Sequence, residues 1–428
     1  MRKPAGAINL MRNLPQPRRL RAEVAQEAPA PPAAANTHIH LPPNFSAFSG
    51  IAQAVEMAHG AGLDLLGAGN YYDFTIYGEF AGECACRGLF PLYGLEIMAQ
   101  LEAQAEAGVT VNDPANPGRT YLCGKGITRF VEPPAEARAI MRKVRENDSR
   151  RMAEMIRRTE GIFAGHGVET GLTAETLAAS VAENAGCPAE AVTLQERHAA
   201  MAFQEALFAR VPVEKRRGRL EEIFRGPVEV SVTQPVAVQN EIRRRLMKAG
   251  MPAFVEEEFV TFEDAVRLIL DLGGIPCYPT LADGAGDFCP FEEPVESLVE
   301  NITGMGLVFA EFIPVRNDVQ VLSSCVTAMR EAGVVVTAGT EHNTLELLPL
   351  GLTARGGEAV PGRVREIFIE GACVAAAHQY LSACGECGYV DSEGNLNPAW
   401  SEGEKRISDF ARLGAAVIRA IGGLAKKG

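Results

Sequence analysis

The chain has 428 residues, of which 47% are hydrophobic and 22% charged, values typical of a globular protein with a substantial core. Its formal net charge of −13 argues against a polyanionic partner such as nucleic acid, and no run of about 18 apolar residues exists to cross a membrane. The length exceeds that of most single domains, which predicts one large α/β domain with an inserted or appended unit. A small-molecule substrate fits these limits better than a macromolecule.

The leader, residues 1–35, is predicted to be a disordered N-terminal extension. It lacks the continuous apolar segment of a secretory signal and contains the Pro/Ala-rich run 28–33. The ten cysteines are scattered along the chain rather than spaced as a small disulfide framework. This distribution favours reduced thiols and a cytoplasmic location.

From residue 36 onward, short β-like runs alternate with helical runs, the pattern of a mainly parallel sheet or barrel. The first part of this barrel is expected over 36–130 and the second over 261–380. The strands are expected at 36–41, 63–69, 89–98, 120–124, 273–279, 306–313 and 333–338. Apolar residues at helical spacing indicate helices at 50–61, 262–272, 292–304 and 317–332.

The segment 131–260 breaks this rhythm, because it is rich in Arg and Glu and its apolar spacing is helical. It predicts a helical insertion between the two parts of the barrel. Its basic run, 215–219, is interpreted as a solvated loop, given the acidic whole. The extension 381–428 is expected to carry a helix over 404–426 that packs on the body of the protein. The insertion and this helix both offer surfaces for a homodimer.

The expected strand 36–41 carries His38 and His40. Side chains two apart on a strand point to the same face, so these imidazoles can bind one metal ion. Polar residues recur near the ends of later strands, and a β/α barrel brings such ends together at one mouth. They are Asn70, Tyr71 and Tyr72 after the second strand, Glu96 on the third, and later Tyr278, Glu311, Glu341, His342 and Asn343.

These segments resemble the motifs of the polymerase and histidinol phosphatase (PHP) family of metal-dependent phosphoesterases. The family motifs are His-x-His, Thr-Asp-His, Gly-x-Glu, Ala-His-Pro and Gly-Ser-Asp-x-His, in that order. The matching segments span roughly 36–130 and 260–345, and read His38-Ile39-His40, Gly69-Asn70-Tyr71, Gly94-Leu95-Glu96, Cys277-Tyr278-Pro279 and Gly339-Thr340-Glu341-His342-Asn343. The resemblance implies a distorted (β/α)7 barrel whose mouth holds one to three divalent metal ions.

Several ligand positions of the family hold neutral side chains here, which argues against more than one metal ion. We expect these side chains to bind substrate instead, together with Glu311, for which a rim ion pair with Arg316 is the alternative. The replaced positions are Asn70, Tyr71, Tyr278 and Asn343. The residues left to bind one divalent ion (zinc, manganese or iron) are His38, His40, Glu96 and Glu341. His342 lies one position from the last histidine of the family motif and is expected to act as a general acid or base.

Three functions follow as hypotheses. The first is a metal-dependent hydrolase of PHP type that acts on a small phosphate ester through a metal-activated water. The second is a mononuclear metal-dependent isomerase or lyase of a sugar or sugar acid, suggested by the amide and hydroxyl groups at the replaced positions. The third is a non-catalytic binding protein on a degenerate barrel.

Overall fold

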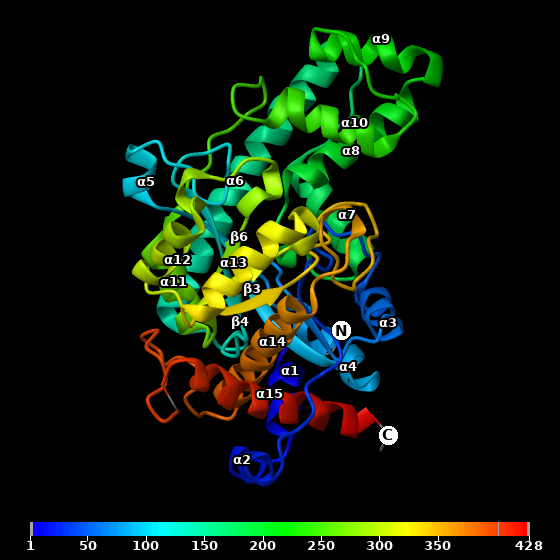
Figure 1. Ribbon diagram of the computed structural model, residues 1–428. Helices are drawn as coiled ribbons and strands as arrows, with labels where there is room; N and C mark the ends of the chain where they lie inside the picture. The colour runs from blue at the N-terminus through cyan, green and yellow to red at the C-terminus, as the bar shows by residue number, and fades with distance from the viewer. Residues whose placement is uncertain (1–2, 401, 426–428) are drawn as a thin grey trace. The chain divides into compact units, whose positions relative to one another are not determined.

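The computed structural model describes residues 3–400 and 402–425 (Figure 1). The chain divides into two compact units. The first unit comprises Met1–Leu41, Ala47–Met141 and Phe259–Gly428, and the second comprises Pro42–Ser46 and Arg142–Glu258. None of the helices in the described part of the chain has the length and apolarity that a membrane crossing requires.

The first unit is built on a barrel-shaped sheet of seven strands in the order β1-β2-β3-β4-β6-β7-β8, and the short strand β5 pairs with β3 beside this path. The strands are β1 (Ala35–Ile39), β2 (Leu65–Ala68), β3 (Phe90–Gln100), β4 (Arg119–Lys125), β5 (Val260–Thr261), β6 (Ile275–Thr280), β7 (Phe309–Phe312) and β8 (Val335–Ala338). All seven strands of the barrel were expected from the sequence. Neighbouring strands are parallel except at β4, which runs antiparallel to both β3 and β6.

The turn after β8 nearly closes the barrel against β1. Thr340 N and Glu341 N both donate to the carbonyl of His38 at 3.0 Å, and His40 N donates to the carbonyl of Glu341 at 2.8 Å. These bonds place the end of the first strand beside the end of the last one. Residues more than 300 positions apart therefore share one mouth of the barrel.

Helices cover the sheet and follow its strands in the βα order that the sequence predicted. The four expected helices correspond to α3 (Ile51–Gly60), α11 (Phe262–Asp271), α12 (Val295–Gly304) and α13 (Val319–Glu331). Further helices are α4 (Tyr77–Cys86), α5 (Glu102–Glu106) and α14 (Gly362–Ala383), which packs on β8. The C-terminal helix α15 (Glu404–Ala425) lies along α14, so it packs on the body of this unit as expected (Figure 1).

The leader is folded within its described residues, contrary to the prediction of disorder. Helix α1 (Ala5–Arg12) buries Ala7 and Met11 against α4 and α14, and the Tyr93 hydroxyl donates to the carbonyl of Ala7 at 3.1 Å. Helix α2 (Pro17–Gln26) contacts α15. The prediction was wrong because the Pro, Ala and Arg content of the leader masks a short apolar stripe, whose burial needs partners from distant parts of the chain.

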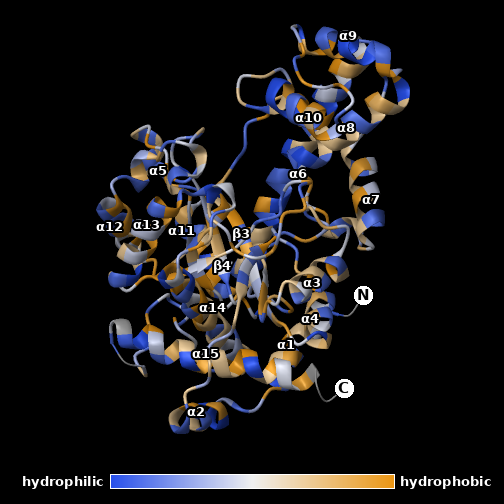
Figure 2. Cartoon of the chain, turned by 45° about the vertical axis from the view of Figure 1, so that its right-hand side comes forward, coloured by the Kyte–Doolittle hydropathy of each residue, from blue (hydrophilic) through white to orange (hydrophobic). Residues whose placement is uncertain are grey.

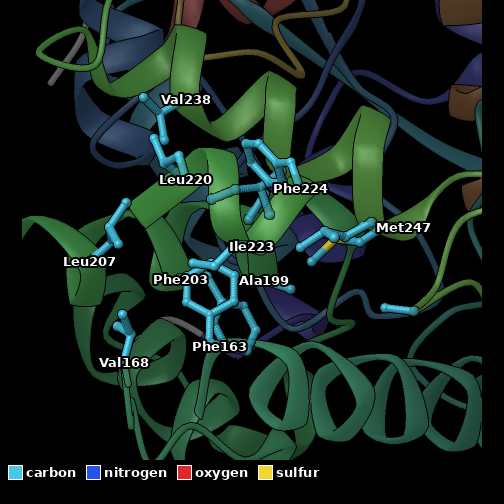
Figure 3. Close-up of a cluster of buried hydrophobic side chains, with 14 of the residues drawn as sticks. Phe163, Val168, Ala199, Phe203, Leu207, Leu220, Ile223, Phe224, Val238 and Met247 are labelled. Atoms are coloured by element: carbon cyan, nitrogen blue, oxygen red, sulfur yellow. The ribbon is translucent and has the colours of Figure 1, made fainter. Parts of the chain in front are cut away.

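The second unit is helical, and most of it lies within the expected insertion. Its helices are α7 (Ala174–Ala185), α8 (Glu196–Arg210), α9 (Val213–Phe224), α10 (Pro235–Ile242) and most of α6 (Ala135–Gly165). Its core gathers around Phe163 and Phe203, whose ring centroids are 4.9 Å apart (Figure 3). Helices α6 and α9 also carry many hydrophilic residues (Figure 2).

The basic run 215–219 belongs to helix α9, so its interpretation as a loop was wrong. The Arg216 side chain donates to the carbonyl of Val211 at 3.1 Å, and that of Arg217 donates to the carbonyl of Val228. These guanidinium groups satisfy main-chain carbonyls at the ends of helices and in loops of the unit. Arg216 and Arg217 thus stabilise the fold of this unit through hydrogen bonds to nearby carbonyl groups.

Candidate metal centre

Four polar side chains converge at the mouth of the barrel. His38 lies on β1, His40 directly follows it, Glu96 lies on β3 and Glu341 follows β8. Nε2 of His38 is 3.4 Å from Nε2 of His40 and 3.4 Å from Oε2 of Glu96. Nε2 of His40 is 3.7 Å from Oε2 of Glu96 and 3.9 Å from Oε1 of Glu341.

These separations suit a bound cation. A tetrahedral ion with metal–ligand bonds of about 2.1 Å has ligand atoms about 3.4 Å apart. The observed distances of 3.4 to 3.9 Å lie at or slightly above that value. The ligand atoms of His38, His40 and Glu96 therefore fit one divalent ion with movements of a few tenths of an ångström. Glu341 joins them on the His40 side, where the ligand atoms of His40, Glu96 and Glu341 all lie within 4.8 Å of one another.

Two glycines leave room for the His38 ring. A Cβ atom on Gly69 would lie 2.6 Å from Nε2 of His38, and one on Gly339 would lie 2.4 Å from its Cβ. Both glycines follow strands that neighbour β1 in the barrel, so any side chain there would displace the imidazole. Gly69 is therefore needed at this position because only a residue without a side chain leaves space for the His38 ring.

Behind His38, the carboxylate of Glu311 on β7 supports the ring. Its Oε1 lies 2.7 Å from Nδ1 of His38, and its Oε2 accepts from Nζ of Lys125. Burial would raise the pKa of Glu311, but Lys125 and His38 outweigh it and lower this pKa to about 2. Burial alone would lower the pKa of His38, but the Glu311 carboxylate outweighs it and raises this pKa. At any pH where His38 is protonated, metal binding must therefore release a proton.

The carboxylate of Glu96 is buried and surrounded by donors. Burial would raise its pKa, but interactions with His40, His38 and the Tyr71 hydroxyl together lower it. The Tyr71 ring stacks on His40 with centroids 5.3 Å apart. Burial raises the pKa of Tyr71 well above its ordinary value, so its hydroxyl remains a neutral donor at physiological pH.

Glu341 reaches the cluster through an unusual backbone. Glu341 and His342 both adopt left-handed conformations, with φ of 67° and 57°, which cost free energy for residues other than glycine. The side chain of Asn343 donates to Oε1 of Glu341 at 2.6 Å, and Nη2 of Arg316 lies 3.4 Å from its Oε2. Arg316 thus pairs with Glu341, whereas the sequence suggested Glu311 as its partner.

Three predicted site residues are not brought to the cluster. Nδ1 of His342 lies 2.9 Å from the Thr340 hydroxyl, and its Nε2 lies 2.9 Å from the carbonyl of Leu348. Both ring nitrogens are therefore occupied away from the other four side chains. The Tyr278 hydroxyl donates to Glu292 at 2.8 Å. The Asn70 side chain bonds both main-chain groups of Leu41, at 2.7 and 2.8 Å.

A cavity of about 180 Å³ opens next to the cluster, space for about six water molecules. His38, Glu96 and Glu341 line it, as do the predicted substrate residues Tyr71, Glu311 and Asn343. Residues that the sequence reasoning missed or placed elsewhere also line it: Asn112, Tyr121, Thr280 and Arg316.

Two more missed residues, Cys123 and Lys125, lie inside the barrel on β4. Cys123 pairs in register with Glu96, and His38, Glu96 and Cys123 together form a second group able to hold a metal ion. The signal was the alternation of β4, because residues 121, 123 and 125 must share one face of the strand.

Glu292 is a fully buried carboxyl behind the cavity-lining residue Leu281. It accepts from the Tyr278 hydroxyl, from Leu281 N at 3.1 Å and from Ala282 N at 2.5 Å, and Leu281 lines the cavity. Burial nevertheless raises the pKa of Glu292 to about 7.

Glu292 is expected to make the free energy of unfolding fall as the pH rises from about 4.5 to about 7. In that window the folded protein binds the proton more tightly than the unfolded chain, and the loss reaches about 3 kcal/mol at higher pH. Urea unfolding measures the free energy of unfolding at pH 5 and at pH 8. Glu292→Gln should reduce the difference between these two values by about that amount. An equal difference between pH 5 and pH 8 in the wild type and in Glu292→Gln would contradict this assignment.

The chain was compared with known proteins. No family model matches it, and no curated protein matches it in sequence. One solved structure with a similar fold is an amidohydrolase from Chromobacterium violaceum with bound sulfate and no metal, at 16% identity and a TM-score of 0.50, covering 78% of this chain and 96% of that one. Another is a protein from Bifidobacterium adolescentis assigned as a metal-dependent phosphoesterase, at 16% identity and a TM-score of 0.52, covering 79% and 97%. At this identity the likeness shows a shared fold.

Proposed function

We propose that this protein is a metal-dependent hydrolase of PHP type that acts on a small phosphate ester. The observation that carries the proposal is the convergence of His38, His40 and Glu96 within 3.4 to 3.7 Å of one another beside a cavity, with Glu341 3.9 Å from His40. The names of the two structures of similar fold, an amidohydrolase and a metal-dependent phosphoesterase, support the same class of reaction.

The four residues would hold one zinc, manganese or iron ion, because two neutral nitrogens and two carboxylates suit any of these metals. Such an ion supplies Lewis acidity, which lowers the pKa of a coordinated water from about 16 toward about 7 and polarises a substrate oxygen. The charges of Glu96 and Glu341 balance the two charges of the ion. Asn343 and Arg316 hold Glu341 in position from two sides.

Arg316 is the residue that we assign to the phosphate group. Among the described residues lining the cavity, it is the only Arg or Lys, and its side chain is 40% exposed. A guanidinium group matches phosphate oxygens with two parallel hydrogen bonds. The Tyr71 hydroxyl gives its one hydrogen to Glu96 and so supports that candidate ligand. An acid or base role for His342 would require its ring to leave Thr340 and Leu348.

Arg316→Gln is expected to raise the KM for a phosphate ester by about tenfold or more, because one charge-assisted contact is worth on the order of 1.4 kcal/mol or above. The metal content is checked in parallel and the assay is run at saturating metal, because Arg316 also pairs with the candidate ligand Glu341. Steady-state kinetics and elemental analysis measure both quantities. Arg363→Gln, on the exposed face of α14, is the matched control. Equal KM values in the two variants would remove Arg316 from the site.

A metal-dependent isomerase or lyase of a sugar or sugar acid is the second candidate. It is favoured by the neutral hydrogen-bonding groups of the cavity wall, which suit the hydroxyls of a polyol. These groups belong to Tyr121 and Thr280.

The deciding experiment is an assay of metal-reconstituted protein. Protein loaded with zinc, manganese or iron is incubated with a panel of phosphomonoesters and phosphodiesters, and released phosphate or alcohol is measured. The proposal expects hydrolysis that a chelator abolishes and metal restores. No hydrolysis with any metal, combined with thermal stabilisation of the loaded protein by sugar acids, would favour the second candidate.

A further inference from the structure

Lys125 is a lysine enclosed in the barrel, with 2% of its surface exposed. Its ammonium group donates to Oε2 of Glu311 and to the carbonyl of Thr37 at 3.2 Å. The Thr37 hydroxyl lies 3.2 Å from the same oxygen of Glu311. A buried ammonium group is costly unless it is paired, so this arrangement is unlike an incidental surface contact.

The contacts continue from Lys125 to the candidate metal centre. Glu311 uses one oxygen for Lys125 and the other for Nδ1 of His38, at 2.7 Å. An ionised carboxylate only accepts hydrogen bonds, so the hydrogen of a neutral His38 must sit on Nδ1. The lone pair of His38 then lies on Nε2, the atom that faces His40 and Glu96.

We propose that Lys125 is a positioning residue of the metal centre, which acts through Glu311 to hold His38 in the tautomer whose Nε2 can bind a cation. This inference rests on the proposed metal-dependent function. Lys125 also interacts electrostatically with Cys123, which belongs to the second group able to hold an ion. Its fixed positive charge therefore disfavours a second divalent cation on that inner side of the cluster.

The test uses two variants and one control. Lys125→Met removes the ammonium group but leaves Glu311 buried without its cation, which can prevent folding. The double variant Lys125→Met/Glu311→Gln removes both charges, and the glutamine amide can either donate to Nδ1 of His38 or accept from it. Arg330→Met is the matched control, because Arg330 is also a buried cation in an ion pair, with Glu370 at 2.7 Å between α13 and α14.

Two readouts are combined. Long-range ¹⁵N NMR of histidine-labelled, metal-stripped protein reports the tautomer of His38, assigned with His38→Gln. Competition with a chelator reports the affinity for Co²⁺, and elemental analysis reports the number of ions bound. At a pH where His38 is neutral, we expect the Nδ1–H tautomer in the wild type and a mixture of tautomers in the double variant, with a 10- to 100-fold loss of Co²⁺ affinity. Arg330→Met should match the wild type in both.

Wild-type tautomer and wild-type affinity in a folded double variant would overturn the inference, as would an equal loss of affinity in Arg330→Met. The NMR readout needs no metal, so it separates this inference from the proposed function. If the wild type binds no Co²⁺ but the double variant changes the tautomer as expected, the proposed function fails and the control of His38 by the Lys125–Glu311 pair stands.

Discussion

Glu96→Ala and His40→Ala are each expected to lose stoichiometric metal binding. Each variant removes a donor atom that lies within 3.7 Å of another donor, and Glu96→Ala also removes one of the two charges that balance the ion. The loss of affinity should exceed the roughly 100-fold that removal of a supporting residue behind a ligand causes. Metal-dependent hydrolysis should fall with it. Elemental analysis after gel filtration and the phosphoester assay measure the two effects.

The matched control for these variants is His59→Ala. His59 lies on α3 with an exposed side chain, so its loss removes one imidazole from the protein without touching the cluster. Its metal content and activity should equal those of the wild type. If Glu96→Ala or His40→Ala retains one ion per chain, the proposed ligand set is wrong.

Gly69→Ala is expected to weaken metal binding although it changes no ligand. The added Cβ would lie 2.6 Å from Nε2 and 2.8 Å from Cδ2 of His38, so the ring must move away from the position that faces His40 and Glu96. We expect a loss of affinity on the order of 100-fold, similar to the loss of a supporting residue. Overpacking of this kind also destabilises the protein, by about 1–3 kcal/mol. Chelator competition and thermal unfolding measure both quantities.

Gly60→Ala is the control for this steric effect. Gly60 ends α3, and a Cβ added there would meet nothing within 4 Å. This variant should bind metal as the wild type does. A Gly69→Ala protein with wild-type affinity would show that His38 does not need its observed position to hold the ion.

The convergence of His38, His40, Glu96 and Glu341 could be anticipated from the sequence, because it depends on regular structure. Period-two spacing places His38 and His40 on the same face of a strand. Glu341 follows the last strand and Glu96 lies within β3 near its carboxyl end, and closure of the sheet brings these strands together. The positions of the seven barrel strands followed in the same way from their short apolar runs. That these four side chains bind a metal ion stays a prediction.

The orientation of side chains in the turns could not be anticipated. Glu341 and His342 are adjacent, and only their left-handed backbone conformations direct the carboxylate into the cluster and the imidazole toward Thr340 and Leu348. A sequence pattern does not report such φ angles for residues other than glycine. Tyr278 was likewise misplaced, since its hydroxyl meets the buried Glu292 rather than the cavity.

The residues behind the ligands were missed for a different reason. Cys123 and Lys125 lie on β4, whose antiparallel direction departs from the regular βα alternation that the sequence predicts. Their importance also depends on Glu311, which meets Lys125 from a strand 186 residues away in the chain. The alternation of β4 indicates which of its residues share a face, but it does not report that Lys125 pairs with a carboxylate from a distant strand.

The most direct test of the metal centre is X-ray absorption spectroscopy of wild-type protein loaded with one equivalent of Zn²⁺. Our account predicts one tightly bound ion per chain, coordinated by two imidazole nitrogens and by carboxylate oxygens at about 2.0–2.2 Å. A spectrum without imidazole scattering, or an unchanged spectrum in a His38→Ala/His40→Ala double variant, would contradict it.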